Sequence, residues 1–384
     1  FYYIKNIKFI DLFAGIGGFH QALHILGGYE CVFASEIDKN AAAVYENNHK
    51  LKPAGDITKI EAKDSPKHEL LCAGFPCQPF SIGGHKKGFE DTRGTLFFDI
   101  ARIADHHKTP FLILENVPNI VSHDNGNTYK TILRTLKKLG YSIDEKPLIV
   151  SPHNLGIPVY RPRTFFLCVR GGGPPVKIDV PKVNFKPNEI SSYFRFKKTK
   201  DKSLYMSEYE LKVLKMWDEF YKLIDIKIVG FPIWYNSFFE DEIDEDHQPW
   251  KKTAMRKSRE LYLRNKKKID IWRKSYENLE WVVPTHKKFE WQCGADCKGV
   301  FDGLIQFRPS GIRVKRLNYF STLVAMNHPQ IVGPIGRRLS SDETKLLQSF
   351  PKSFKPHEKR PIALKQFGNA VNVKVVEYLV KKMM

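Results

Sequence analysis

The sequence lacks any run of 18 or more apolar residues, so we expect no membrane-spanning helix. It shows no secretory signal, and it begins at Phe1 without an initiator methionine, so we expect a few residues to precede it. Only 6 of its 384 residues are cysteine, and they are scattered, mostly within apolar runs. This usage suits a reducing compartment better than a disulfide scaffold, so we expect a cytoplasmic protein.

Acidic residues are also scarce relative to basic ones. The chain has 42 Asp and Glu against 62 Lys and Arg, which gives a net charge of +20. The excess is +4 over residues 1–170, +9 over residues 171–335 and +7 over residues 336–384. This distribution favours a polyanionic partner for the latter half of the chain. A generally basic surface is the alternative.

The first 60 residues are typical of a nucleotide-binding α/β unit. A strand over residues 8–13 leads into a glycine turn over residues 14–18 and a helix over residues 19–26. A second strand (32–35) ends at Glu36, and we expect Asp56 to end a shorter third strand. The turn lacks the G-x-G-x-x-G pattern that seats a pyrophosphate, so S-adenosylmethionine is favoured over a dinucleotide. The alternative is an ordinary surface turn followed by two helix-capping acids.

A thiol is held at the end of the next apolar strand. Residues 70–74 form that strand, and Cys77 follows directly after Pro76. Open α/β sheets place their ligands at the carboxyl ends of strands. The segment 82–94 has glycines and charges without periodicity, which is typical of a functional lid, although a plain surface loop has the same composition.

Two further motifs follow buried segments. The most apolar strand, over residues 111–114, ends at Glu115, where burial should raise the carboxyl pKa. A helix-capping carboxylate would have the same pattern. Arg161 and Arg163 precede another apolar strand and predict an anion or carbonyl clamp, unless they are a surface pair.

Together these segments resemble the DNA (cytosine-5) methyltransferases of bacterial restriction-modification systems. The resemblance covers about residues 8–170 and 336–380. It depends on five motifs in the family's order, namely Phe13-Ala14-Gly15-Ile16-Gly17-Gly18, Pro76-Cys77-Gln78, Glu115-Asn116-Val117, Arg161-Pro162-Arg163 and Gln366-Phe367-Gly368-Asn369-Ala370-Val371.

The resemblance implies catalytic roles. Cys77 would add to carbon 6 of cytosine, and a protonated Glu115 would donate to ring nitrogen 3. Asn116 would hold the neighbouring backbone. Arg163 would steady the base carbonyl and the surroundings of Cys77, and Arg161 would support Glu115 or a phosphate.

The same resemblance implies S-adenosylmethionine as the cofactor. The residues implied in its pocket are Phe13, Ala14, Gly15, Gly17, Gly18, Glu36, Ile37, Asp56, Ile57, Pro76, Asn369, Ala370 and Val371. The family commonly has glutamine where this chain has Val159, from which we expect weaker loop anchoring. Gly83 cannot fill the space left by a flipped base, so another residue would do so.

The middle of the chain has a different pattern. A linker over residues 171–175 precedes an expected helix over residues 207–224 and a basic helix over residues 251–274. The basic helix predicts phosphate contacts or a solvated helix whose aromatics pack on the core. Cys293 and Cys297 lack a second ligand pair, so we expect no metal site. The expected DNA-binding residues are Gln78, Ser81, Lys86, Lys87, Arg93, Arg308, Arg313, Arg316 and Thr322.

We therefore predict an α/β enzyme with a doubly wound, Rossmann-like sheet and a smaller target-recognition domain. Residues 1–170 and 336–384 would form the catalytic domain, and residues 171–335 would read duplex DNA. We expect a monomer on DNA, associated with the nucleoid of a prokaryote, and a cognate restriction endonuclease as a functional partner. The alternatives are an RNA cytosine-5 methyltransferase, a nicotinamide-dependent dehydrogenase and a non-catalytic DNA-binding protein.

Overall fold

The chain folds into two compact units. The computed structural model describes residues 6–76, 96–186, 189–194, 196, 199–226, 229–240, 246–294, 296–321 and 330–384. Unit 1 comprises residues 1–184, 321–326 and 341–384, and unit 2 comprises residues 185–320 and 327–340. The first boundary falls after Asn184 rather than in the expected linker at residues 171–175, because Val176, Ile178 and Val180 pack on the core of unit 1. The chain then returns to unit 1 twice, at residues 321–326 and at residues 341–384, rather than once after residue 335.

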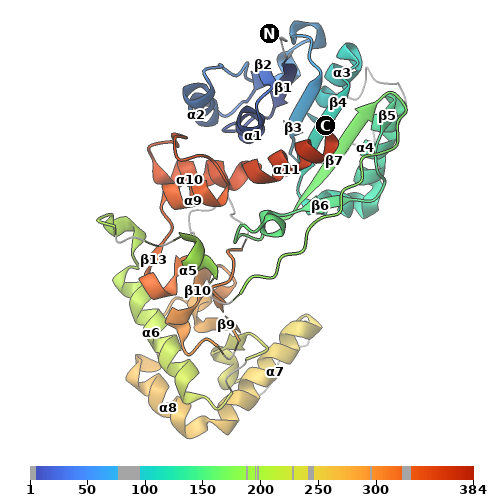
Figure 1. Cartoon of the computed structure of the whole chain (residues 1–384). Helices are drawn as coiled ribbons and strands as arrows, with labels where there is room; N and C mark the ends of the chain where they lie inside the picture. Colours follow the sequence, from blue (N-terminus) through green and yellow to red (C-terminus); the bar gives the residue numbers. More distant parts are fainter. Residues whose placement is uncertain are drawn as a thin grey trace. The chain divides into compact units, whose positions relative to one another are not determined.

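Unit 1 is built on a mixed sheet, as the sequence predicts for an α/β fold (Figure 1). Its strands are β1 (Ile7–Leu12), β2 (Tyr29–Ser35), β3 (Leu70–Gly74), β4 (Phe111–Asn116), β5 (Tyr141–Ser142), β6 (Leu148–Val150) and β7 (Arg163–Arg170). They follow the order β2-β1-β3-β4-β7-β5, with β6 also paired to β7. Strands β1 to β4 are mutually parallel, whereas β7 runs antiparallel to β4.

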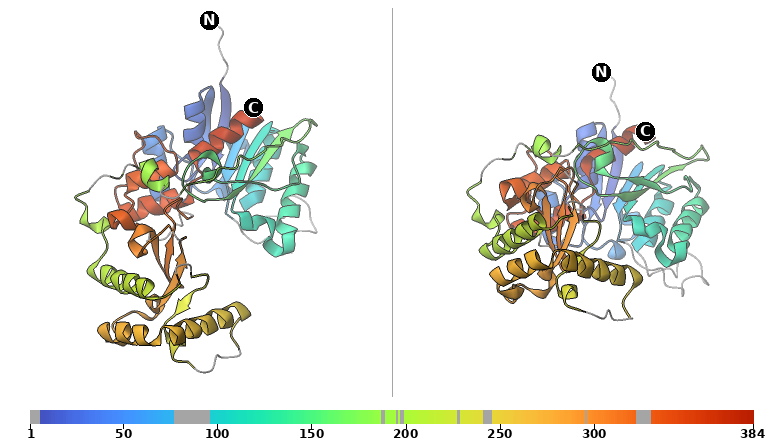
Figure 2. Two further views of the ribbon diagram at one scale, coloured as in Figure 1. Left: turned by 60° about the horizontal axis from the view of Figure 1, so that its bottom comes forward. Right: turned by 90° about the horizontal axis from the view of Figure 1, so that it is seen from below.

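Helices cover both faces of this sheet. They are α1 (Gly18–Leu26), α2 (Lys39–His49), α3 (Leu96–His107), α4 (Asn127–Lys138), α9 (Ser341–Leu347), α10 (Arg360–Asn369) and α11 (Val373–Met383). Alternate strand residues such as Cys72 and Ile113 pack with α1 and α11, while Leu71 and Leu112 pack with α3 and α4. Figure 2 shows α11 crossing one face of the sheet, where it packs against α1.

The third strand expected to end at Asp56 does not form. Residues 51–56 are irregular, since Pro53 and Gly55, whose φ is 84°, do not suit a strand. Asp56 instead caps a short 3₁₀ turn over Ile57–Lys59, and its carboxylate accepts hydrogen bonds from the backbone and hydroxyl of Thr58 at 3.0 and 2.8 Å. A helix-capping role for Asp56 was the alternative interpretation of the sequence.

Unit 2 combines short helices with a second sheet. Its elements are α5 (Glu189–Phe194), α6 (Glu208–Leu223), β8 (Ile233–Trp234), α7 (Pro249–Arg264), α8 (Lys266–Ser275), β9 (Lys288–Gln292), β10 (Leu304–Arg308), β11 (Gly311–Lys315), β12 (Ile331–Val332) and β13 (Arg337–Arg338). The sheet order is β13-β12-β10-β11-β9-β8. Helix α6 begins with a capping box made by Ser207 and Glu210, which confirms the predicted helix.

The expected continuous basic helix over residues 251–274 is wrong. It breaks at Asn265, whose side-chain amide donates to the carbonyl of Leu261 at 3.1 Å and which separates α7 from α8. Tyr262 and Trp272 are buried in the core of unit 2, together with Cys293 and Cys297. Their burial supports the interpretation that the aromatics of this segment pack on the core.

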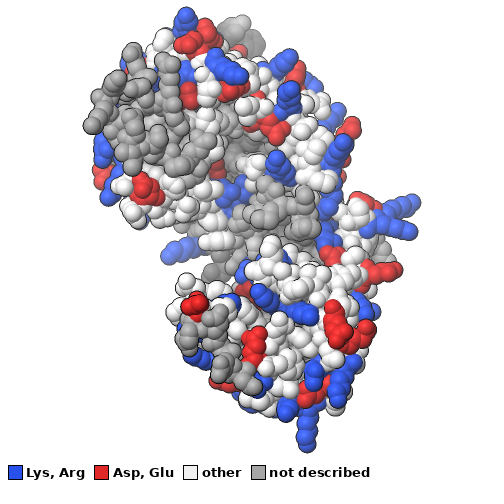
Figure 3. Space-filling model, turned by 180° about the vertical axis from the view of Figure 1, so that it is seen from behind, with Lys and Arg blue, Asp and Glu red and all other residues white. Residues whose placement is uncertain are grey.

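No helix within the described ranges is long and apolar enough to cross a membrane. Lys and Arg side chains are mixed with Asp and Glu on the face of the molecule shown in Figure 3. Net charge alone therefore does not identify a binding surface, which has to be found from specific contacts.

Candidate active site

One edge of the unit 1 sheet brings together residues from four strands. The parallel strands β1, β3 and β4 end at this edge, and the antiparallel β7 begins there, opposite the end of β4. Gly74 is paired with Glu115 across β3 and β4. A cavity of about 560 Å³ lies at this edge and is lined by the loops that follow the parallel strands, by Arg161 and Arg163, and by α10. Its volume is in the range of small-molecule sites.

Glu115 has the environment of a carboxyl that favours its proton. Its Oε1 lies 2.8 Å from Nε of Arg163, and a side chain at Gly74 would come within 3.3 Å of its Oε2. Burial raises the pKa of Glu115 above its ordinary value, an effect that the nearby Arg163 and Arg161 oppose but do not cancel. This confirms the raised pKa that the sequence predicts for an acid following a buried strand.

Asn116 fixes the backbone that leads to the expected nucleophile. Its Nδ2 donates to the carbonyl of Phe75 at 2.9 Å, and its Oδ1 accepts from the backbone of Val117 at 2.8 Å. Pro76, the next residue after Phe75, lines the cavity. Cys77 lies outside the described residues, as do Gln78, Ser81, Lys86, Lys87 and Arg93.

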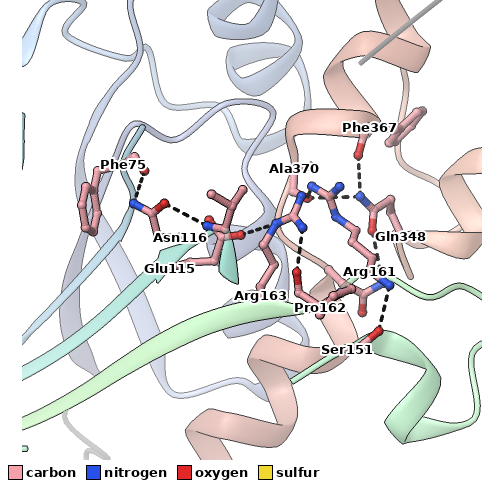
Figure 4. A network of polar contacts seen from close by, with 12 residues as sticks. Phe75, Glu115, Asn116, Ser151, Arg161, Pro162, Arg163, Gln348, Phe367 and Ala370 are labelled. Carbon is pink, nitrogen blue, oxygen red and sulfur yellow. Dashed lines mark hydrogen bonds and ion pairs between the residues drawn. The ribbon is translucent and has the colours of Figure 1, made fainter. Parts of the chain in front are cut away.

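Arg161 connects this edge to the C-terminal segment (Figure 4). It is 2% exposed, and its Nη2 donates to the carbonyl of Ala370 at 3.0 Å. Gln348 donates to the same carbonyl at 3.1 Å and also to that of Phe367. Burial and the neighbouring Arg163 lower the pKa of Arg161 to about 9, so its guanidinium is charged at neutral pH. The C-terminal segment, residues 341–384, thus contacts this edge through buried hydrogen bonds.

The loops that follow β1 and β2 also line the cavity. The Glu36 carboxylate accepts from the backbone of Gly15 and of Asp38, each at 2.7 Å, which orders the glycine turn. Ile37 is 71% exposed and lines the cavity, so it offers an apolar surface to a flat ring. Asp56 lies beside it on the cavity wall.

The structure separates the expected cofactor residues into two groups. Those that line the cavity are Phe13, Gly15, Glu36, Ile37, Asp56, Ile57, Pro76 and Asn369. Those that do not line it are Ala14, Gly17, Gly18, Ala370 and Val371. Two of these glycines make room for protein instead of ligand. A Cβ at Gly17 would be 2.3 Å from Nε2 of His49, and one at Gly18 would be 2.6 Å from the carbonyl oxygen of Val371.

The cavity also contains a residue to which sequence reasoning gave no role. Gln366 is 8% exposed and lines the cavity, and neither atom of its side-chain amide has a hydrogen-bond partner among the described residues. An unpaired buried amide is costly unless a ligand or water satisfies it. The residues present therefore fit a polar cofactor such as S-adenosylmethionine. The motif spanning residues 366–371 contained this glutamine, but nothing in the sequence indicated its orientation.

The expected DNA-binding residues that the structure describes belong to unit 2. Arg308 and Arg313 both form ion pairs with Glu290, and Arg316 pairs with Asp296 at 2.8 Å. Thr322 lies outside the described residues. Each of these arginines is thus paired with a carboxylate, and Arg308 and Arg313 are largely buried, whereas Arg316 is 46% exposed.

Comparisons with known proteins identify the family to which this chain is similar. Residues 7–384 match the family described as C-5 cytosine-specific DNA methylase. The chain is 32% identical to Type II methyltransferase M.AluI of Cellulosimicrobium cellulans, across 98% of this chain and 91% of that protein. It is 34% identical to Type II methyltransferase M.HhaI of Haemophilus parahaemolyticus, across 98% and 94%.

Solved structures with low sequence identity share the fold. The Dnmt2 methyltransferase of S. pombe superposes with a TM-score of 0.52 at 18% identity and 98% coverage of both chains. The methyltransferase EhMeth of Entamoeba histolytica gives 0.54 at 17% identity, with coverage of 99% and 98%.

Proposed function

The chain belongs to the C-5 cytosine-specific DNA methylase family, and from this membership we propose that it transfers a methyl group from S-adenosylmethionine to carbon 5 of a cytosine flipped out of duplex DNA. The observation that carries the proposal is the buried pair of Glu115 and Arg163 at the edge of a 560 Å³ cavity that Pro76 also lines. The carboxyl of Glu115, whose pKa is raised, lies there beside the Arg163 guanidinium and near Pro76, the residue before Cys77.

The cofactor would occupy the end of the cavity near the glycine turn. S-adenosylmethionine, when bound, supplies an electrophilic methyl group on a sulfonium. Glu36 would accept hydrogen bonds from its ribose hydroxyls while it still holds the backbone of Gly15. Ile37 would pack against adenine, and Asp56 would accept from the adenine amino group.

The chain's own residues would prepare cytosine for methylation. The Cys77 thiolate would add to carbon 6, and Glu115 would give its proton to ring nitrogen 3, so no negative charge builds up on the ring. Carbon 5 would then take the methyl group and give its proton to a base that lies outside the residues assigned here. As the thiolate leaves carbon 6, ring nitrogen 3 would return its proton to Glu115. Arg163, which contacts Glu115 in the structure, would reorient the proton-depleted carboxylate and hold it until it is protonated again.

The two units would divide the work. Unit 1 would bind the cofactor and perform catalysis, and unit 2 would recognise the DNA sequence. Both curated relatives described above are named type II methyltransferases, which supports a role beside a cognate restriction endonuclease. We expect a monomer on DNA in the cytoplasm of a prokaryote.

The test is transfer of tritium from labelled S-adenosylmethionine to plasmid DNA, compared with Cys77→Ala and with total tRNA as the acceptor. The proposal predicts label on DNA that is lost in the variant, and bisulfite sequencing of the product would then reveal the methylated site. Label on tRNA alone would favour the RNA cytosine-5 alternative. No label on either acceptor would contradict the proposal.

A further inference from the structure

One face of the unit 2 sheet has a cluster of polar side chains at its centre. Glu290 on β9 is directly paired with Arg313 on β11, and Arg313 is paired in turn with Gln306 on β10. Paired residues share a face, and Arg308, two residues after Gln306, lies on that face as well. The alternate residues of the same strands, including Phe289 and Ile312, belong to the core. We call Glu290, Gln306, Arg308 and Arg313 the polar face; β9 and β10 are labelled in Figure 1.

Glu290 is the centre of this polar face. Its Oε1 lies 3.0 Å from Nη2 of Arg313, and its Oε2 pairs with Nη2 of Arg308. The three side chains are only 19 to 27% exposed. Burial and the charge of Arg313 both lower the pKa of Arg308, whereas Glu290 raises it. The carboxylate therefore holds two like charges together that would otherwise repel each other.

The polar face keeps hydrogen-bonding capacity that the protein does not use. Nε of Arg308, Nε of Arg313 and Oε1 of Gln306 are buried without a partner among the described residues. Each guanidinium has five N–H donors in a planar fork, and Glu290 engages each through Nη2. Buried polar atoms left unpaired are costly, so a cluster that served only stability would be expected to satisfy them.

The chemistry of the polar face suits base edges better than phosphates. Arginine pairs with the O6 and N7 acceptors of guanine, glutamine with adenine, and glutamate accepts from the cytosine amino group. A phosphate would meet the Glu290 carboxylate at the centre of the cluster, and the two anions would repel each other. A base pair offers donors and acceptors together, so it can use both signs of charge.

We propose that this polar face contacts base edges of the target DNA, that Arg308 and Arg313 read guanine, and that Glu290 is the positioning residue that aims them. The proposal rests on the proposed function, in which unit 2 recognises DNA. It adds which residues of unit 2 read bases, which base they read, and which residue orients them.

The test uses binding, not methyl transfer, and starts from the site that bisulfite sequencing identifies for the wild-type protein. Binding to that duplex is compared with duplexes in which single guanines are replaced by 7-deazaguanine or by adenine. The variants are Arg308→Met, Arg313→Met, Arg313→Lys and Glu290→Gln. The matched controls are Asp270→Asn and Arg273→Met, because this pair on α8 has a separation of 2.8 Å and exposures of 27% and 27%.

The proposal predicts that wild type binds the cognate guanine roughly 5- to 150-fold better than adenine at a read position. Arg308→Met or Arg313→Met should remove that preference at one position and make binding there insensitive to 7-deazaguanine. Lysine at 313 should not restore it, because a point charge lacks the planar fork. Glu290→Gln should weaken discrimination at both positions, while the α8 controls keep it and urea unfolding stays comparable.

Other outcomes would overturn the proposal. Uniform weakening on all sequences, a salt slope reduced by about 1 and rescue by Arg313→Lys would show phosphate contacts instead. Unchanged discrimination in all four variants would show that the cluster is only structural. If wild type methylates no DNA cytosine, the proposed function itself fails. This result can be distinguished from phosphate contacts and from a purely structural cluster, because both of those are measured by binding.

Discussion

Nε of Arg163 lies 2.8 Å from Oε1 of Glu115, although the two residues come from strands that run in opposite directions. Strand β4 ends where the antiparallel β7 begins, so the acid and the arginine meet at one sheet edge. Burial raises the pKa of the carboxyl while the guanidinium keeps it oriented. In the proposed mechanism, this relationship would orient Glu115 as a proton donor before a base arrives.

Glu115→Gln should lower the rate of methyl transfer by about 10²- to 10⁴-fold, the usual contribution of a general acid. The protonated fraction of Glu115 falls as pH rises through its raised pKa, so the wild-type rate should decline on the alkaline side. The glutamine variant should lose this pH-dependent decline. Single-turnover rates across pH would measure both, with the surface variant Glu145→Gln as the control. An unchanged pH profile in Glu115→Gln would exclude Glu115 as the donor.

Gly15→Ala and Gly17→Ala should distinguish a glycine that leaves room for a ligand from a glycine that leaves room for a protein side chain. Both glycines have positive φ, 55° and 87°, so the backbone cost of alanine is similar. A Cβ at Gly15 meets nothing within 4 Å, whereas one at Gly17 would collide with His49. We expect Gly17→Ala to be about 1 to 3 kcal/mol less stable than Gly15→Ala in urea unfolding. Gly15→Ala should instead weaken cofactor binding by calorimetry, and equal stabilities would contradict this assignment.

Ile37→Ala should weaken binding of S-adenosylmethionine about tenfold without loss of stability. The side chain is 71% exposed in the cavity, so its apolar area is buried only when the ligand binds. Ile25→Ala is the matched control, because Ile25 is also exposed, at 46%, but lies outside the cavity. Calorimetric titration with S-adenosylhomocysteine would measure the difference. Equal affinities of the two variants would rule out the adenine role.

His49 should make unit 1 sensitive to mild acid. Burial lowers its pKa from 6.5 to about 4, so the folded protein holds the neutral ring. Its stabilising effect is present above the unfolded pKa of 6.5 and is lost as pH falls toward 4, about 2 kcal/mol between pH 7 and 5. His20, stacked on it with the ring centroids 4.1 Å apart, acts in the same direction, since burial lowers its pKa to about 3.

Other groups titrate in the same range, so a difference measurement is required. The buried Asp11 has a pKa well above its ordinary value and therefore acts in the opposite direction. Urea unfolding of wild type and His49→Gln at pH 7, 6 and 5 isolates the one histidine. The gap between the two proteins should change by about 2 kcal/mol in favour of the variant as pH falls. A gap independent of pH would contradict the buried neutral state.

The local features of the fold were predictable from the sequence. Apolar runs predicted β3 and β4, and the helix expected over residues 207–224 corresponds to α6. The strand predicted to end at Asp56 was wrong, because an acid that caps a 3₁₀ turn has the same sequence pattern as an acid that ends a strand. The helical periodicity of residues 251–274 continued through Asn265 and hid the break there.

The non-local contacts were not predictable. Gly17 and Gly18 suggested a ligand, but they are required by His49 and by Val371, the second of which lies 353 residues further along the chain. Arg308 and Arg313 were expected to contact DNA, but no local pattern showed that both pair with Glu290 on another strand. The antiparallel direction of β7, which brings Arg163 to Glu115, has no signature in a single apolar run. Each of these contacts joins residues that are far apart in the sequence, so no local sequence pattern predicts it.

The central claim is that Cys77 attacks cytosine in DNA, and a covalent trap tests it most directly. In duplex DNA with 5-fluorocytosine in place of cytosine, carbon 5 has no proton to lose after methylation, so the adduct cannot release the enzyme. With S-adenosylmethionine present, the account predicts a protein–DNA complex that survives denaturing electrophoresis, maps to Cys77 by peptide analysis and is absent in Cys77→Ala. A complex mapped to another residue, or none under conditions that methylate ordinary DNA, would contradict it.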